Sequence, residues 1–216
     1  MEQEKSINVY NLIILDESGS METIYNETIS AINETLSGIR RAQKKYPNQR
    51  HFVSIITFEG RGMKAIKVRR NRVAAEEVED FTNKDYRPLS FTPLYDAMGY
   101  AITELDKNIS SDDAVMVTVI TDGYENASEE YTCKAVMDLV SQQKEKGWTF
   151  AYIGANQDAR RVAEKLNISN ALNFEASSYG MRKMSLELDE ARAFYCCKLA
   201  EDGFVSSLEN LFDDED

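Results

Sequence analysis

Two apolar segments, each followed by an aspartate, constrain the fold of this chain more than any other feature. Residues 8–16 (NVYNLIILD) become almost entirely apolar before Asp16, and residues 114–121 (AVMVTVIT) are nearly all apolar before Asp122. Strands with apolar side chains on both faces are buried on both faces, as in the middle of a parallel sheet covered by helices. The sequence therefore predicts an α/β protein with an aspartate at the end of each of two central strands.

Helix-like and strand-like segments alternate along the rest of the chain. The pattern predicts helices over 24–46, 93–106, 131–146, 157–166 and 178–199, and further strands over 52–58, 64–69, 148–153 and 171–174. The connection between strands 52–58 and 64–69 is too short for a parallel crossover, so this pair is an antiparallel hairpin. The predicted fold class is a doubly wound α/β sheet, mostly parallel, with one antiparallel edge strand from the hairpin.

One domain is expected over residues 1–200, because 216 residues with 43% hydrophobic content can bury a full core and no linker interrupts them. Residues 201–216 form an acidic tail with seven carboxylates and no Lys or Arg. In this tail Phe204, Leu208, Leu211 and Phe212 have the spacing of one helix face. Either these residues pack on this domain as a terminal turn or fray, or they dock into a groove of a partner.

Charge and hydropathy exclude several functions. The net charge is −12 and no basic stripe is present, which argues against nucleic-acid binding. No run approaches the roughly 20 apolar residues that a membrane-spanning helix needs. The three cysteines have no metal-ligand spacing and are interpreted as reduced thiols, so a cytoplasmic location is expected. His51, the only histidine, precedes a predicted strand and is expected at the surface or in a cap.

Acidic and hydroxyl side chains converge at one predicted edge of the sheet. In the common doubly wound strand order the strands that end at Asp16 and Asp122 are neighbours, and ligands bind outside the carboxyl ends of such strands. The loop after Asp16 and a long connection later in the chain add hydroxyls at the same edge. All five side chains are hard oxygen donors, which suit Mg²⁺ or Mn²⁺ better than zinc or copper. The set is Asp16, Ser18, Ser20, Thr92 and Asp122.

Each of these residues also has an ordinary structural interpretation. Thr92 before Pro93 is typical of a helix N-cap followed by proline at the first helical position. Ser18 and Ser20 are compatible with a turn or cap, and the dipeptide that starts at Asp122 is common in turns. Only the convergence of three separate segments favours a joint role in binding a cation.

The segments DESGSM (16–21), FTPLYDAM (91–98) and VITDGYEN (119–126) together resemble the metal-ion-dependent adhesion site of von Willebrand factor A domains. The resemblance covers roughly residues 7–199, and the ligand pattern is intact. YIGANQDA (152–159) is similar to the corresponding segment of stand-alone bacterial members. The resemblance implies that the hydroxyls of Ser18, Ser20 and Thr92 touch the cation, and that Asp16 and Asp122 hold it directly or through water.

The resemblance further implies a function in protein binding. Neutral hydroxyls leave a Mg²⁺ or Mn²⁺ ion electrophilic, so the ion is expected to capture an Asp or Glu side chain of another protein; Ca²⁺ is less favoured because carboxylates are few. The residues around the ligands are expected to contact that partner: Glu17, Gly19, Met21, Phe91, Gly123 and Tyr124.

Two alternatives come from other functional classes. The loop after Asp16 is similar to the nucleophile loop D-x-D-x-T of haloacid-dehalogenase-type phosphatases, but Ser18 stands where the general acid belongs, so an enzyme is not expected. The other alternative is an interaction scaffold of the same fold that uses no metal. Dinucleotide binding is excluded because the only G-x-G, at 60–62, lacks the third glycine and lies in the hairpin turn.

Overall fold

The computed structural model describes residues 6–155, 158–203 and 207–212. The strands are β1 Ile7–Asp16, β2 Gln49–Phe58, β3 Ile66–Ala74, β4 Ala114–Thr121, β5 Thr149–Ala155 and β6 Asn170–Phe174. The α-helices are α1 Tyr25–Lys45, α2 Leu94–Asp106, α3 Cys133–Glu145, α4 Ala159–Lys165 and α5 Ser178–Asp202, and two short 3-10 helices, η1 Gly19–Ile24 and η2 Met63–Ala65, complete the set. The alternation predicted from the sequence is confirmed, with element boundaries shifted by a few residues.

The sheet has the order β3-β2-β1-β4-β5-β6, so the two aspartate-terminated strands are neighbours. Parallel pairing aligns Leu15 with Ile120 and Asp16 with Phe58, which brings the carboxyl ends of β1, β2 and β4 to one edge. The β2–β3 pair is antiparallel, as the short connection predicted. The doubly wound, mostly parallel sheet is confirmed.

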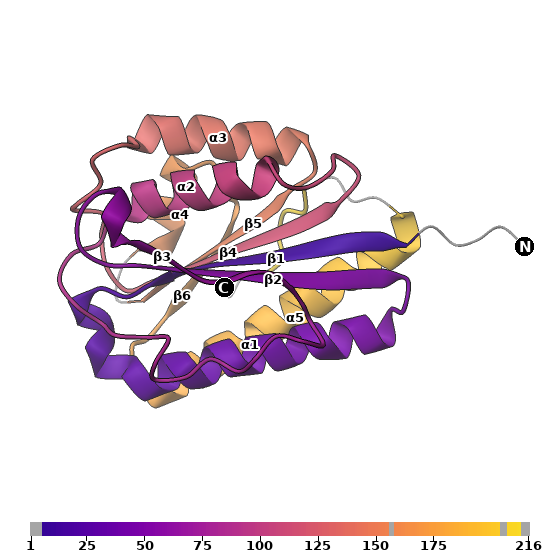
Figure 1. Ribbon diagram of the computed structural model, residues 1–216, viewed down its shortest axis with the longest axis horizontal. Coiled ribbons are helices and arrows are strands. Elements are labelled where there is room, and N and C mark those ends of the chain that lie inside the picture. Colours follow the sequence, from indigo (N-terminus) through magenta and orange to yellow (C-terminus); the bar gives the residue numbers. More distant parts are fainter. Residues whose placement is uncertain (1–5, 156–157, 204–206, 213–216) are drawn as a thin grey trace, which may run out of the picture.

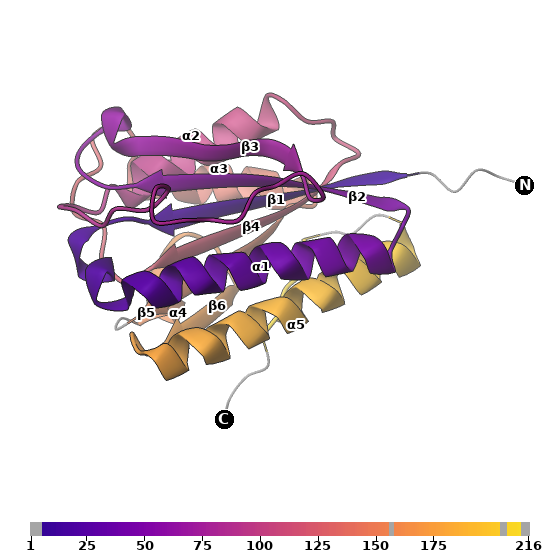
Figure 2. The same ribbon diagram turned by 60° about the horizontal axis from the view of Figure 1, so that its bottom comes forward.

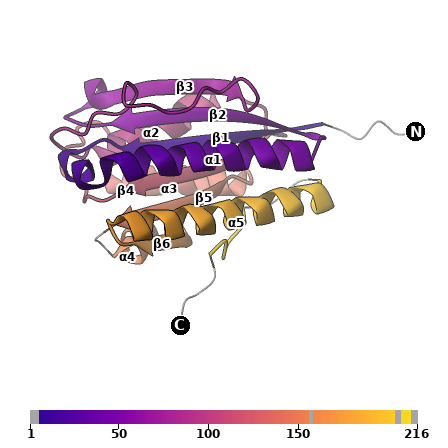
Figure 3. The same cartoon turned by 90° about the horizontal axis from the view of Figure 1, so that it is seen from below.

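Helices cover both faces of the sheet (Figure 1). One face packs on α2, α3 and α4, and the other on α1 and α5, with one apolar core on each side. Figures 2 and 3 show α1 and α5 side by side across their face. They approach closely at Gly38, where a Cβ would lie 2.0 Å from the Asp189 carboxylate. Among the described residues no helix is long and apolar enough to cross a bilayer.

Two sequence expectations about individual residues are settled by this packing. His51 lies inside β2 and is buried, so its expected surface or capping position is wrong: β2 begins at Gln49, earlier than predicted. Burial, followed by the Arg192 guanidinium, lowers the pKa of His51 to about 4.

In the tail, Leu211 is buried in the core and its N–H donates to Asn170 Oδ1. This part of the tail packs on its own domain; Phe204 lies outside the described residues.

Candidate metal centre

Asp16 ends β1 as a buried carboxylate with all of its oxygens engaged. Its Oδ1 accepts from the Ser18 N–H at 2.7 Å, and its Oδ2 accepts from the Thr121 hydroxyl at 2.5 Å. Its backbone carbonyl accepts from the Tyr86 hydroxyl at 2.9 Å. The side chain is therefore fixed at the sheet edge by β4 and by its own loop, and the backbone is fixed by the connection that precedes α2.

A chain of hydroxyls links this loop to the end of β4. The Ser18 and Ser20 hydroxyl oxygens are 3.2 Å apart, and Ser20 donates to Asp122 Oδ1 at 2.5 Å. Ser18 occupies the N-cap position of η1, yet its hydroxyl makes no capping bond. These serines are therefore not explained as helix caps. Their oxygens gather with the carboxylate that follows β4.

The structure also brings Thr92 to this cluster. A Cβ placed on Gly123 would lie 3.1 Å from the Thr92 hydroxyl oxygen and 3.7 Å from Asp16 Oδ2, so both oxygens border the same small space. The backbone of Thr92 is held by Asn126, whose side chain accepts the Thr92 N–H at 2.9 Å and whose N–H donates to the Thr92 carbonyl at 3.1 Å. Five oxygen-bearing side chains from three segments thus meet at one edge.

The N-cap interpretation of Thr92 does not hold. The N-cap of α2 is Pro93, and side chains of the loop after β4 cap the helix instead: Glu125 accepts from the Tyr95 N–H and Ser128 accepts from the Asp96 N–H, each at 3.0 Å. The Thr92 hydroxyl makes no hydrogen bond with any residue in the described part of the chain, although the residue is 3% exposed. A hydroxyl that serves no structural bond is free to contact a ligand.

The two carboxylates have raised pKa values. Burial raises the pKa of Asp16 to about 7, opposed by the hydrogen bonds from Thr121 and Ser18 and reinforced by the nearby charge of Asp122. Burial likewise raises the pKa of Asp122, with the Ser20 hydroxyl acting in the opposite direction. Burial disfavours the ionised form of both carboxylates, and a divalent cation between them would favour it.

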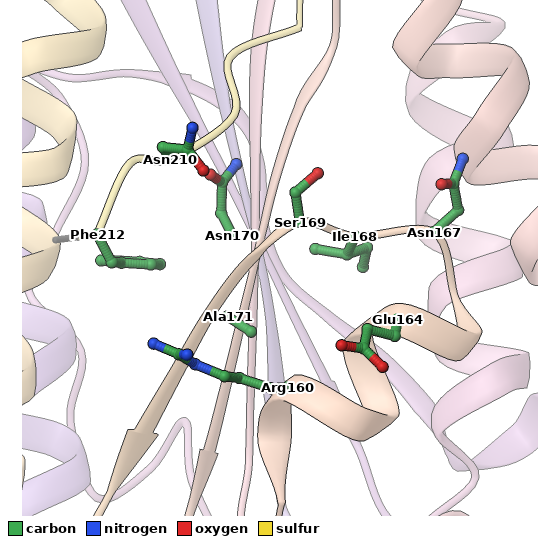
Figure 4. Close-up of a pocket in the computed structure, with 9 residues that line it drawn as sticks. All are labelled: Arg160, Glu164, Asn167, Ile168, Ser169, Asn170, Ala171, Asn210 and Phe212. Carbon is green, nitrogen blue, oxygen red and sulfur yellow. The ribbon is translucent and has the colours of Figure 1, made fainter. Parts of the chain in front are cut away.

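The donor set fits a small hard cation. Within the described residues no group of three or more His, Cys, Asp or Glu side chains is placed to hold a metal. The cluster at the carboxyl edge instead has two carboxylates and three hydroxyls, a set of oxygen donors that suits Mg²⁺ or Mn²⁺, which retain water ligands readily. The hollow of about 440 Å³ in Figure 4 lies instead at the amino end of β6, and its lining contains none of these five residues.

The six residues expected to contact a partner divide into two groups. Gly19, Phe91 and Tyr124 are exposed and Gly123 is partly exposed at the rim of the cluster. Glu17 and Met21 are fully buried, so the expectation that they contact a partner is wrong. Met21 joins the core beneath η1, and Glu17 turns inward to Arg69 of β3, whose side-chain nitrogen lies 3.0 Å from each of its carboxylate oxygens.

Several residues that shape the centre were not identified from the sequence. Thr121 and Tyr86 hold Asp16, and Asn126 holds Thr92. Asp96 accepts from the N–H groups of Glu129, Glu130 and Tyr131 at 2.8–2.9 Å and so fixes the loop after Asp122. Thr121 and Asn126 stand next to recognised motif residues, but nothing in that pattern distinguishes their roles.

Gly123 supplies the space that the Thr92 hydroxyl occupies. We expect Gly123→Ala to weaken Mn²⁺ binding, because the added methyl would lie 3.1 Å from that hydroxyl and push it away. Gly19→Ala is the matched control, since its added methyl would meet nothing closer than 3.7 Å. Calorimetric titration with Mn²⁺ checks both variants. Equal affinities in the two variants would show that the space beside Gly123 is not part of the centre.

Comparisons with known proteins agree with this architecture. The family description of the von Willebrand factor type A domain matches residues 12–187. A mussel byssus protein, proximal thread matrix protein 1 with a zinc-occupied MIDAS motif, is similar with a TM-score of 0.61 and 14% identity, over 88% of this chain and 46% of that chain. The von Willebrand factor type A protein from Catenulispora acidiphila has a TM-score of 0.58 and 15% identity, over 85% of this chain and 42% of that one.

A shorter structure, the SpRpn10 VWA domain, is similar with a TM-score of 0.60 and 10% identity, over 83% of this chain and 94% of that chain. The chain spans about half the length of the first solved structures that it matches, 47% in each case. At these identities the likeness shows the fold alone. No curated protein sequence matches the chain.

Proposed function

Since the chain belongs to the von Willebrand factor type A domain family, we propose that it is a divalent-cation-dependent protein-binding module that captures an acidic side chain of a partner. The family assignment supports a role in protein interactions. That the chain binds a divalent cation, and that this cation captures an acidic side chain, is proposed from the geometry at the carboxyl edge of the sheet.

The uncommitted hydroxyl of Thr92 carries the proposal. It makes no hydrogen bond with the described residues and borders the same space as Asp16 Oδ2, and the residue as a whole is 3% exposed. Asp16, Ser18, Ser20, Thr92 and Asp122 would hold the cation, which we propose to be Mg²⁺ or Mn²⁺ because every donor is a hard oxygen. When bound, the cation supplies a positive centre for a carboxylate from outside the chain.

Binding fits Asp16 better than catalysis does. A nucleophilic aspartate of the phosphatase type needs a general acid beside it that protonates the leaving group. The position two residues later, where the phosphatase-like pattern needs an acid, is Ser18. We therefore propose a binding module and not a hydrolase. The three free thiols support the further proposal of a reducing, cytoplasmic location.

Selection from a random peptide library tests the proposal without knowledge of the partner. The full chain is immobilised in Mn²⁺, a library displayed on phage is applied, and bound phage are eluted with EDTA. We expect the eluted peptides to share an Asp or Glu, because only a carboxylate gains from the positive centre. The double variant Ser20→Ala/Thr92→Ala should yield no such peptides, whereas Ser30→Ala, an exposed change on α1, should behave as the wild type.

Other outcomes would contradict the proposal. Peptides that stay bound in EDTA would favour the metal-free interaction scaffold. Peptides eluted by EDTA without a shared acid would show that the cation does not act by capturing a carboxylate.

A further inference from the structure

We propose that the partner segment is acidic and apolar together: one carboxylate goes to the cation, a neighbouring apolar side chain packs on Leu89 and Phe91, and a second acid pairs with Arg61. This inference rests on the proposed function and adds the chemistry of the partner around the captured acid. Its basis is the composition of the surface around the candidate centre.

Large exposed hydrophobic side chains gather on the loops at the carboxyl edge. Leu89 is 58% exposed, Phe91 44% and Tyr124 61%, while Met63 of η2 is 39% exposed. They belong to the three connections that follow β2, β3 and β4 in the chain. Exposed apolar side chains that gather beside a polar centre are typical of an interaction surface. We call Met63, Leu89, Phe91 and Tyr124 the apolar rim.

Hydrogen bonds hold the rim against the centre. The Gly19 N–H donates to the Ser90 carbonyl at 3.4 Å, and the Gly60 N–H donates to the Phe91 carbonyl at 3.1 Å. Between them Ser90 adopts a left-handed backbone, φ 41°, which a residue with a side chain rarely does. The Ser90 hydroxyl donates to Glu59 at 3.1 Å. The loop that carries Leu89 and Phe91 is therefore fixed between the serine loop and the hairpin turn.

Arg61 provides the second charge. Its guanidinium lies 4.4 Å from the centroid of the Phe91 ring, the residue directly before Thr92. Within the described part of the chain it makes no ion pair and no hydrogen bond, whereas Lys67 pairs with Glu59 and Glu17, and Arg69 with Glu17. Glu129 approaches the same turn at Gly62 without pairing with Arg61. A cation stacked on an aromatic ring keeps its donors free for a carboxylate.

Charge complementarity selects the occupant. On a chain with net charge −12, three exposed basic side chains lie on the rim beside the candidate cation site: Arg61, Lys64 and Arg87. They outnumber the two exposed acids beside them, Glu22 near Leu89 and Glu129 near Gly62. An acidic partner is attracted there even though the chain as a whole would repel it. A segment with two acids and an apolar residue matches both the charges and the apolar rim.

Charge reversal at Arg61 tests the inference with the same peptide selection. The matched control is Arg50→Glu: Arg50 is also exposed and stacks on a ring, 5.7 Å from the Phe52 centroid, but lies near the amino end of β2. For the wild type and the control we expect peptides with two acids and an apolar residue. For Arg61→Glu we expect the selected peptides still to share one acid and still to be eluted by EDTA. Their second acid should be lost or replaced by Lys or Arg.

Synthetic copies of the selected peptides then give the size of the effect. Arg61→Glu should weaken the two-acid peptide at least about tenfold, since like charges repel, and leave Mn²⁺ affinity unchanged. Identical peptide preferences in Arg61→Glu and the wild type would overturn the inference while the proposed function stands. If the wild type itself does not bind Mn²⁺, the proposed function is overturned.

Discussion

Asp16→Asn will stabilise the metal-free protein at pH 8 and at the same time abolish its response to divalent cations. The folded-state pKa of Asp16 is raised by burial from its ordinary value of 3.8 to about 7. Between these two values the folded state binds more protons than the unfolded state, so stability falls as the pH rises through this window. Above pH 7 the ionised Asp16 carboxylate lowers the free energy of unfolding by its full amount. This amount is roughly 4 kcal/mol, because the pKa is raised by about three units.

An asparagine at this position is uncharged and can satisfy the same contacts. Its oxygen would accept from the Ser18 N–H, and its amide would donate to the Thr121 hydroxyl, which in turn donates to the Gly123 carbonyl. We therefore expect Asp16→Asn in EDTA to unfold at a higher temperature than the wild type, by several degrees. The difference should shrink as the pH falls from 7 toward 4, because Asp16 is then increasingly protonated in the folded state and finally in both states.

Thermal melts from pH 4 to pH 8, in EDTA and with millimolar Mn²⁺, check this result. The wild type should gain stability from Mn²⁺, about 2.7 kcal/mol at 100 times the Kd, and Asp16→Asn should gain none. If Asp16→Asn is instead less stable than the wild type in EDTA at pH 8, the Asp16 carboxylate stabilises the fold. Its burial then has no free-energy cost that a bound cation would relieve.

Glu17→Gln will lower the free energy of unfolding by about 3 kcal/mol, although the residue lies within the proposed binding loop. Glu17 is fully buried and accepts from Arg69 at 3.0 Å, from Lys67 at 3.4 Å and from the backbone N–H of Arg87. Removing one partner of a buried ion pair leaves the other charge without compensation. The expected loss of stability is at the lower end of the range for buried ion pairs, because water reaches the side chain of Arg69, which is 20% exposed.

The matched control is Glu59→Gln. Glu59 pairs with the same Lys67 at 3.0 Å, but its side chain is partly exposed and its loss leaves the Glu17–Arg69 pair intact. We expect a cost of about 1 kcal/mol or less for the control. Urea denaturation gives both free energies. Equal losses in the two variants would contradict the structural role assigned to Glu17.

The positions of Asp16 and Asp122 could be predicted because they depend on long patterns. Two apolar runs define central strands, and the doubly wound order makes those strands neighbours. The role of Thr92 could not be decided in the same way, because a helix cap before Pro93 and a metal ligand leave the same local pattern. Only the observed helix start and the free hydroxyl distinguish them.

The inward turn of Glu17 could not be predicted either. It depends on Arg69, which is 52 residues away and reaches Glu17 only because β3 folds back on β2. Met21 is buried because η1 turns it toward the core, and the motif alone does not fix which residues of that turn face inward. His51 was misplaced because β2 begins before its apolar stretch. Local motifs predicted the strand ends, whereas long-range pairing decided which side chains of the loops are buried.

Titration of the full chain with Mn²⁺, followed by the electron paramagnetic resonance signal of the free ion, tests the central claim most directly. The claim predicts one site per chain in the wild type, a loss of that site in Asp16→Asn, and clearly weaker binding in Thr92→Ala. Binding that is equal in the wild type and in both variants would place any metal elsewhere, and no binding in the wild type would contradict a divalent-cation centre at the carboxyl edge of the sheet.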